Sequence, residues 1–197
     1  MLKAFKCRLY PTKTQMSQLN QHIGACRFVY NWGLERKIKS YELEGKSVSR
    51  FDLNKEIVHE LKLEYPWLKE VNSQSLQGAI TSLESAFTKF FREKTGFPNF
   101  KSKKNATQSF SVPQHYVVDF DTNRIKLPKI GWVKAILHRR FEGDLKTATV
   151  SMTRTGKYFI SILVDDGKEL PKPEPFDYES TVGIDVGITH FATLSTG

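Results

Sequence analysis

The sequence predicts an α+β protein, with helices in its first half and short strands in its second half. Within residues 12–104, apolar side chains recur every three or four positions, which is the spacing of amphipathic helices. Within residues 108–164 they alternate with polar side chains, which is the spacing of half-buried strands. A last apolar, β-branched run covers residues 182–194. This order of elements is typical of the α+β class.

The composition indicates a folded, cytoplasmic chain with a polyanionic partner. The 197 residues are 39% hydrophobic and 12% aromatic, so a sizeable core is expected. The formal net charge is +9 at pH 7, which favours binding to a polyanion. No apolar run is long enough to span a bilayer, and no signal-peptide pattern is present. Cys7 and Cys26 form no Cys-x-x-Cys pair, so they predict neither a disulfide framework nor a zinc knuckle.

The basic residues are gathered in blocks. Residues 1–50 hold 10 Lys or Arg against 3 Asp or Glu, and residues 89–104 hold 6 against 1. The stretch 51–88 between them is mildly acidic, with 3 against 6. Blocks of this kind indicate a surface track for phosphates, whereas evenly spread basic residues would indicate only solubility.

The first elements are a strand and two helices. The strand runs from Leu2 to Tyr10, and Thr12 or Thr14 can cap the helix that follows it. Gly24 is expected to break or bend that helix, and a second helix is expected over 25–41. Two helices with a short break resemble a helix-turn-helix, although any helical pair gives the same pattern.

Further helices are expected from Phe51 onward and from Ser73 to Lys94. The second of these is the clearest in the chain, because apolar residues form a continuous seam from Leu76 to Phe90. Its first turn carries Gln74 and Gln77, and glutamine can pair bidentately with the edge of adenine. The plainer interpretation is a solvated, capped helix start.

A basic loop with two rings, Phe97 and Phe100, follows at residues 96–104. Aromatic rings within a cationic run suit base stacking together with phosphate contact. The alternative is that these rings pin the loop into the core.

Short strands are then expected at 108–112, 115–120 and 124–127, with another from Lys129, and a hairpin of 146–154 and 157–164. Strands of this length with turn signals between them predict a small barrel or sandwich. The proline-containing stretch that follows is typical of an extended linker.

A single carboxylate, Asp185, stands in the middle of the last apolar run, between Gly183 and Gly187. Residues two apart in a strand share a face, so the glycines leave room beside Asp185 for a metal ion or a nucleic-acid backbone. A lone strand aspartate beside two structural glycines fits the same short pattern. The chain stops at a turn without a returning strand, so we interpret the sequence as the front part of a longer protein. The alternative is a short natural variant in which a partner covers the edge of this strand.

Six segments together resemble the N-terminal half of TnpB (OrfB) proteins, which are encoded by insertion sequences and are compact relatives of the type V CRISPR nucleases. The resemblance implies a wedge β-barrel formed by residues 1–11 and 105–165, with a helical recognition domain inserted at 12–104. It also implies a linker at 166–180 and the incomplete start of an RNase H-like RuvC nuclease domain at 181–197. The matching segments are Phe5–Pro11, Gly24–Trp32, Gln77–Phe91, Gly96–Pro98, Leu127–Lys134 and Gly183–Gly187.

The same resemblance implies a guide RNA and target double-stranded DNA as partners, with no membrane and no small-molecule substrate. Asp185 matches the first of three carboxylates that hold two Mg²⁺ ions in this family, whose zinc ribbon lies further along. One carboxylate cannot hold both ions, so these residues are expected to bind nucleic acid without cutting it. Whether the chain acts as an enzyme therefore stays undecided. The alternatives are a non-catalytic DNA- or RNA-binding remnant or repressor, and a helix-turn-helix transposase accessory subunit.

Asp185 is thus the predicted catalytic and metal-binding residue. The residues predicted to contact nucleic acid are cationic, polar or aromatic, and the resemblance assigns reading of the DNA motif to Phe51, Ser73, Gln74, Gln77 and Gln114. Asn99 stands where many relatives have arginine, which removes one phosphate contact. The full predicted set is Lys6, Arg8, Arg27, Asn31, Arg36, Lys37, Phe51, Ser73, Gln74, Gln77, Phe97, Lys101, Lys103, Lys104, Gln114, Lys129, Trp132, Lys134, Arg139 and Arg140.

Overall fold

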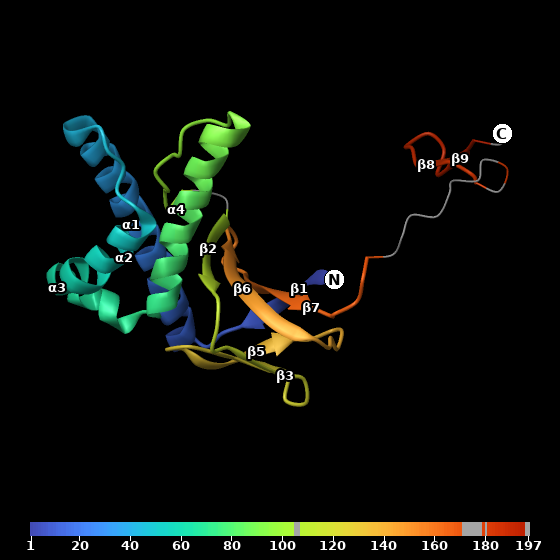
Figure 1. Cartoon of the computed structure of the whole chain (residues 1–197). Helices are drawn as coiled ribbons and strands as arrows, with labels where there is room; N and C mark the ends of the chain where they lie inside the picture. Colours follow the sequence, from blue (N-terminus) through green and yellow to red (C-terminus); the bar gives the residue numbers. More distant parts are fainter. Residues whose placement is uncertain (105–106, 171–178, 180, 196–197) are drawn as a thin grey trace. The chain divides into compact units, whose positions relative to one another are not determined.

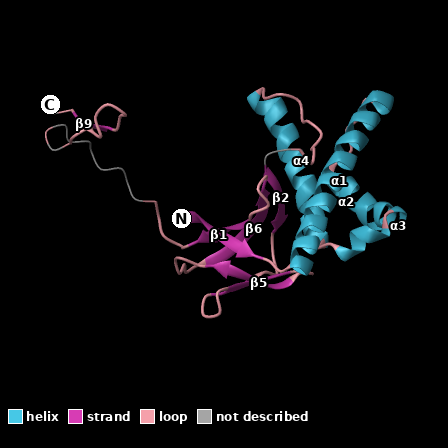
Figure 2. Cartoon of the chain, turned by 180° about the vertical axis from the view of Figure 1, so that it is seen from behind, coloured by secondary structure: helices cyan, strands magenta, loops and turns pink. Residues whose placement is uncertain are grey.

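The computed structural model describes residues 1–104, 107–170, 179 and 181–195. The chain forms two compact units, one of residues 2–167 and one of residue 1 with residues 168–197. In the larger unit the helices lie together on one side and the strands on the other (Figures 1 and 2). This mixture of helix and sheet confirms the predicted α+β class. None of the helices in the described ranges is long and apolar enough to cross a bilayer.

The helical half begins with the longest helix of the chain. A capping box starts it, because Thr12 Oγ1 accepts from the Gln15 amide at 3.3 Å and Gln15 Oε1 accepts from the Thr12 amide at 3.1 Å. Gly45, with φ of 65°, ends it in the left-handed conformation. The helical elements are α1 Lys13–Glu44, α2 Arg50–Glu56, a π-helical turn Ile57–Leu61, α3 Lys62–Glu64, a 3₁₀ turn Pro66–Glu70 and α4 Ser73–Glu93.

The predicted break at Gly24 is wrong, since α1 continues through this residue. Its neighbours Ile23, Ala25 and Cys26 are all buried, so tertiary packing holds the helix on both sides of the glycine. One glycine in a helix costs about 1 kcal/mol relative to alanine, which is less than the burial of these side chains contributes. The first pair of separate helices is instead α1 and α2, which a short turn at 45–49 connects.

The sheet has seven antiparallel strands in the order β2-β6-β7-β1-β5-β4-β3. The first strand of the chain lies inside the sheet, where β1 pairs with β7 on one side and with β5 on the other. The predicted hairpin of β6 and β7 is confirmed. The strands are β1 Leu2–Tyr10, β2 Thr107–Val112, β3 Val117–Asp119, β4 Arg124–Leu127, β5 Gly131–Ile136, β6 Asp144–Thr153 and β7 Tyr158–Asp165.

This sheet curls without closing. Its two edge strands, β2 and β3, are joined by residues 113–116 alone. In a flat sheet the edges would lie about 29 Å apart at the usual strand spacing, whereas the connection spans at most about 18 Å. The sheet must therefore bend. No pairing joins β2 to β3 in the described chain, so the predicted barrel does not close; β3 is short, and α1 and α4 pack against β2.

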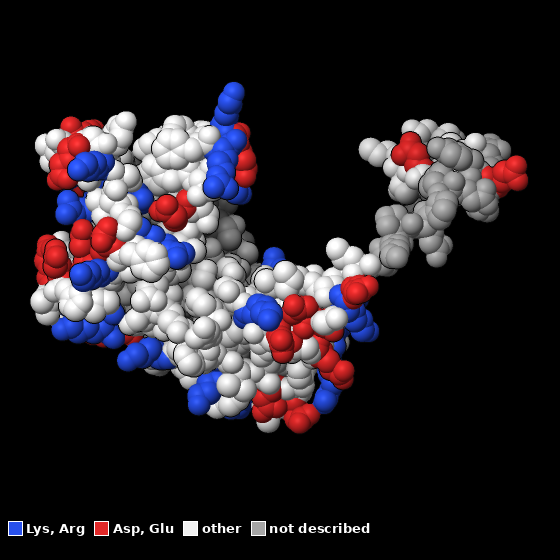
Figure 3. Space-filling model, in the orientation of Figure 1, with Lys and Arg blue, Asp and Glu red and all other residues white. Residues whose placement is uncertain are grey.

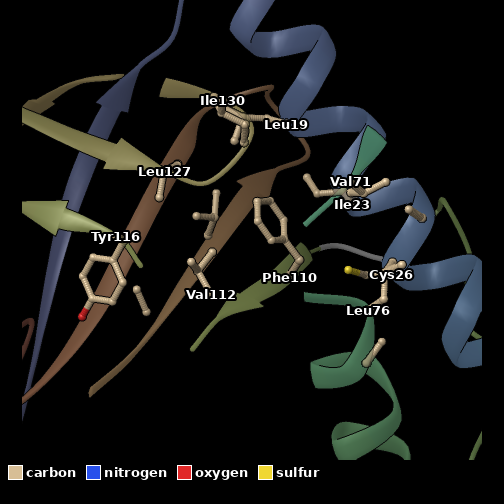
Figure 4. Close-up of a cluster of buried hydrophobic side chains, with 14 of the residues drawn as sticks. Leu19, Ile23, Cys26, Val71, Leu76, Phe110, Val112, Tyr116, Leu127 and Ile130 are labelled. Carbon is tan, nitrogen blue, oxygen red and sulfur yellow. The ribbon is translucent and has the colours of Figure 1, made fainter. Parts of the chain in front are cut away.

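A continuous hydrophobic core joins the helices to the sheet. Figure 4 shows Leu19 and Ile23 of α1 and Leu76 of α4 beside Phe110 and Val112 of β2. The predicted seam of α4 supplies its buried face, with Leu76, Ile80 and Leu83 fully enclosed. This core fixes the position of α4 relative to β2, and the candidate site lies between these two elements.

Among its described residues the smaller unit has two short strands, β8 Ile184–Asp185 and β9 Thr193–Leu194, which pair antiparallel. The apolar run 182–194, which the sequence predicts to be of strand type, forms strand only at these two short segments. Its apolar side chains, among them Ile184 and Val186, are exposed, and a two-stranded hairpin without a covering layer is only marginally stable. Most of the predicted linker, 166–180, lies outside the described residues.

Candidate nucleic-acid interface

An uncharged groove of about 400 Å³ lies between α4, β2 and the connection that follows β2. We call it the amide groove. None of its lining residues is charged, and the surface over the first half of α4 and over β2 is largely white in Figure 3, with charged side chains around it. The lining residues are Gln74, Gln77, Gly78, Thr81, Ser82, Ser111, Pro113, Gln114 and Thr147.

Interlocked contacts fix the start of α4, which carries the groove's glutamines. The Asn72 side chain caps the helix by accepting from the Gln74 amide at 3.3 Å. The Asn72 amide in turn donates to His22 Nε2 at 3.2 Å, while His22 Nδ1 donates to the Gln18 carbonyl at 2.8 Å. These two bonds require the neutral ring. Burial lowers the pKa of His22, and the bond to Gln18 acts in the opposite direction.

The predicted residues Gln74, Gln77 and Gln114 meet in the amide groove. Gln74 Nε2 donates to Gln114 Oε1 at 3.3 Å, so the first turn of α4 reaches the connection after β2. Gln74 Oε1 is buried and has no hydrogen-bond partner within the described part of the chain. Leaving a buried acceptor unpaired costs about 1–3 kcal/mol, so a rotation of the Gln74 amide that brought Oε1 to a ligand's donor in the groove would be favourable.

The other two residues assigned to motif reading lie outside the groove. Phe51 is 76% exposed on α2, where its ring lies 5.4 Å from the guanidinium of Arg50. Ser73 accepts a hydrogen bond from Lys62 Nζ at 2.8 Å. The structure therefore brings three of the five together.

Several predicted cationic and polar residues are engaged by the protein's own groups. Lys37 is buried, and its ammonium lies 3.1 Å from Glu84 and donates to the Val48 carbonyl at 2.7 Å. Arg36 pairs with Glu56 at 3.0 Å, and this hydrogen bond raises the pKa of Arg36. These contacts hold the helical half together.

The basic loop is tied to α1 and α4. Asn31 donates to the Lys101 carbonyl at 3.0 Å and accepts from the Lys101 amide at 2.7 Å. The Phe97 ring packs on Phe87 and Phe90 at 5.5 and 5.4 Å, so this ring does pin the loop. Phe97 is still 47% exposed, which leaves part of the ring accessible.

On the sheet, Lys6 and Arg8 both lie 4.9 Å from the ring of Phe159. Arg140 pairs with Asp121 at 2.7 Å. The remaining predicted residues of the loop and sheet are exposed, and they are Lys103, Lys104, Lys129, Trp132, Lys134 and Arg139. Arg27 donates to Gln108 Oε1 at 2.9 Å and lines a separate cavity together with Lys101.

Asp185 is exposed in β8, opposite Thr193. The Gly183 amide donates to Ser195 Oγ at 2.9 Å, and a side chain at Gly183 would meet Ser195 at 3.4 Å, so Ser195 occupies part of the space left by this glycine. Within the described ranges no three His, Cys, Asp or Glu residues gather to hold a metal ion. Asp185 alone does not fit a pair of Mg²⁺ ions, and Cys7 and Cys26 are separate buried thiols. No cleavage step follows from these residues.

Comparisons with known proteins identify the family. The model of the OrfB helix-turn-helix domain matches residues 1–46. The protein "Putative RNA-guided DNA endonuclease InsQ" of Escherichia coli (strain K12) is 36% identical over all of this chain and 48% of its own length. The chain belongs to the TnpB/OrfB family. A "Putative RNA-guided DNA endonuclease" of Streptomyces pristinaespiralis is 34% identical over 99% of this chain and 48% of its own length.

The chain thus spans about half the length of these two TnpB/OrfB relatives. A shorter protein, "Virulence protein VsdF" of Salmonella dublin, is 38% identical over 113 residues, which are 52% of this chain and 95% of that protein. Residues 1–46, which match the helix-turn-helix model, fold here into β1 and α1 with the start of the following turn.

The sequence analysis missed the uncharged side chains that complete the amide groove, and it missed His22. A signal was present in α4, because serine, threonine and glutamine recur at helical spacing opposite the apolar seam, from Gln74 to Thr88. No comparable pattern marks Thr147 or His22, which reach their places only through the tertiary fold.

Proposed function

We propose that these residues provide the nucleic-acid-binding function of an RNA-guided DNA endonuclease of the TnpB type, with a guide RNA and double-stranded DNA as partners. The names of the full-length relatives support the endonuclease class, and the net charge of +9 supports a polyanionic partner. In this proposal the curled sheet is assigned to the family's wedge domain, and α1 to α4 are assigned to its recognition domain. The protein acts in the cytoplasm.

The observation that carries this proposal is the meeting of Gln74, Gln77 and Gln114 in a groove whose described lining residues are all uncharged, where Gln74 Oε1 lacks a partner among the described residues. Cationic side chains bind phosphates in any sequence, whereas uncharged donors and acceptors distinguish base edges. A glutamine amide offers one donor and one acceptor, which match N7 and the N6 amino group of adenine. We therefore assign the reading of a short DNA motif to Gln74, Gln77 and Gln114.

Cleavage is a separate part of the proposal. Asp185 is proposed as one carboxylate of a RuvC-type site that binds Mg²⁺, and the zinc site of the family is assigned to none of the described residues. Two divalent cations need several oxygen ligands, so the described residues alone are expected to bind DNA without cutting it.

The test is a selection of randomised DNA duplexes by the purified chain with its co-purified RNA. The wild type is expected to enrich a short motif, and Gln77→Leu is expected to relax one motif position while total affinity changes by less than about tenfold. Thr88→Val is the matched control, because Thr88 is exposed on the same helix, α4, and does not line the groove. Absence of any motif in the wild-type pool, or identical pools for the two variants, would contradict the assignment.

A second candidate is a non-catalytic binding protein or repressor. The Salmonella relative favours it, because nearly all of that shorter protein aligns with part of this chain. A helix-turn-helix accessory subunit of a transposase is a further form of this candidate, supported by the matching family model. Gel shifts before and after RNase treatment separate the candidates: loss of DNA binding after RNase supports RNA guidance, and unchanged binding supports a protein that recognises DNA directly.

A further inference from the structure

A second cavity, of about 140 Å³, adjoins the amide groove between α1, α4, β2 and the basic loop. Gly78, Ser82 and Ser111 line both spaces, so they form the wall between them. A side chain at Gly78 would meet Ser111 Cβ at 3.3 Å, which shows how closely α4 approaches β2 at this wall. The cavity is several times the roughly 30 Å³ that one water occupies in the liquid, so it has room for a small oxyanion.

Two cationic side chains, Arg27 and Lys101, line this cavity, and none of the described residues that line it is acidic. Arg27 donates one bond to Gln108 Oε1 at 2.9 Å, which leaves most of the guanidinium's donors unused by protein groups within the described ranges. Lys101 Nζ lies 4.0 Å from the centre of the Tyr30 ring and forms no ion pair with the described residues. Neither cation has an acidic partner among the described residues, so an anion bound in the cavity would meet both charges without competition from a carboxylate.

The environment of the cavity supports the same conclusion. Loss of solvation lowers the pKa of Lys101. Figure 4 shows the sulfur of Cys26 directed toward β2, where the cavity lies. Burial raises the pKa of Cys26 to about 12, so this thiol supplies no negative charge at neutral pH. The hydroxyls of Ser109 and Ser111 form no hydrogen bonds with other described residues and are available as donors.

We propose that this cavity binds one phosphate group, held by Arg27 and Lys101 with the serine hydroxyls of β2 as additional donors. This inference rests on the proposed function, because the phosphate is assigned to the backbone of the bound nucleic acid. It sits beside the amide groove, so it fixes the register in which the neighbouring base meets Gln74 and Gln77. Free inorganic phosphate has the same chemistry and is the alternative source.

The first experiment measures binding of inorganic phosphate to the full chain. Sodium phosphate is titrated against sodium chloride at equal ionic strength while the melting temperature is followed, since a ligand of the folded state raises it. The wild type and Lys89→Met are expected to show the same saturating rise, because Lys89 is exposed on α4 and lies outside the cavity. Lys101→Met is expected to bind phosphate about ten- to a hundredfold more weakly, through loss of one charge-assisted hydrogen bond.

Arg27→Gln is the second variant, with circular dichroism to establish that it folds, because Arg27 also holds Gln108 of β2. An equal response to phosphate in Lys101→Met and Lys89→Met, with Arg27→Gln also unchanged, would overturn the proposal.

The second experiment separates the two sources of phosphate. Each phosphate of a bound oligonucleotide is replaced in turn by a neutral methylphosphonate, and affinity is measured for wild type and Lys101→Met. One position is expected to weaken the wild type about tenfold or more and to have little effect in the variant, which assigns the cavity to a backbone phosphate. If phosphate raises the melting temperature but no position couples to Lys101, the cavity binds free phosphate and its assignment to nucleic acid is overturned. If the chain binds phosphate but no RNA or DNA, the proposed function fails while the anion site stands.

Discussion

Single residues decide how accurately the start of α4 is placed. His22 is 2% exposed and links α1 to the residue before α4, with one ring nitrogen donating and the other accepting. Asn72, which His22 holds in place, caps α4 by accepting a hydrogen bond from the Gln74 amide, so the position of Gln74 is fixed as well. A base-reading side chain discriminates only when its amide is held in one orientation, so His22 and Asn72 are positioning residues for the amide groove.

The His22 contact predicts a specific dependence of stability on pH. Its folded pKa lies below the value near 6.5 of an unfolded histidine, so above that pH both states are neutral. As the pH falls below it, the unfolded chain takes up a proton first, and the folded state loses stability until its own pKa is reached. His22→Gln is expected to lower the free energy of unfolding by about 1–2 kcal/mol at pH 7.5 and by less at pH 5.

Urea unfolding of wild type and variant at several pH values measures this difference. His59→Gln is the matched control, because His59 is exposed and makes none of the contacts that hold the start of α4. A difference between wild type and His22→Gln that stays constant from pH 7.5 to 5 would show that protonation of His22 does not limit stability.

At the scale of elements, periodicity predicted which segments are helices and strands. Long-range packing determined whether α1 continues through Gly24 and which side chains meet in the amide groove. The apolar seam of α4 and the alternation in β1 and β7 are local patterns, and both were predicted correctly. The continuity of α1 through Gly24 was not, because burial of Ile23 and Cys26 against other elements outweighs the local preference. The amide groove likewise could be predicted only in part from local sequence patterns. Gln74 and Gln77 could be proposed from one helix turn, but Thr147 reaches them only because β6 pairs with β2.

Two glycines of α1 give opposite predictions for the same substitution. Gly24 has no heavy atom within 4 Å of an added Cβ, so Gly24→Ala is expected to stabilise the fold by about 0.5–1 kcal/mol through helix propensity. At Gly33 an added Cβ would lie 2.8 Å from Ile80 Cδ1 and 3.1 Å from Leu83 Cδ2 in the seam with α4. Gly33→Ala is therefore expected to destabilise the fold by about 1–2 kcal/mol.

Denaturant midpoints of the two alanine variants test this pair, with each variant serving as the control for the other. Stabilisation by both substitutions would mean that α4 can move away from α1 without destabilising the fold. The position of the amide groove would then not be fixed by the packing of α4 on α1. Destabilisation by Gly24→Ala would mean that the backbone at position 24 needs the conformational freedom of glycine, as the predicted helix break would require.

At the scale of the larger unit, affinity and selectivity reside in different surfaces. The amide groove has no charged lining residue, while exposed lysines and arginines lie on the basic loop and the sheet. Uncharged contacts change little with salt, whereas each neutralised phosphate releases counterions. The two kinds of contact can therefore be told apart by one measurement, the slope of affinity against salt.

We expect the logarithm of the affinity for single-stranded RNA to fall linearly with the logarithm of salt concentration, with a slope of about −3.5 if roughly five phosphates are contacted. Lys103→Met and Lys104→Met, in the exposed part of the basic loop, should each make the slope shallower by up to about 0.7. Gln77→Leu should leave the slope unchanged, because its amide neutralises no phosphate. Fluorescence anisotropy between about 50 and 200 mM salt measures the affinity of all four proteins.

A wild-type slope near zero would mean that the net charge of +9 does not bind phosphates. A shallower slope for Gln77→Leu would mean that the amide groove holds a phosphate in place of a base.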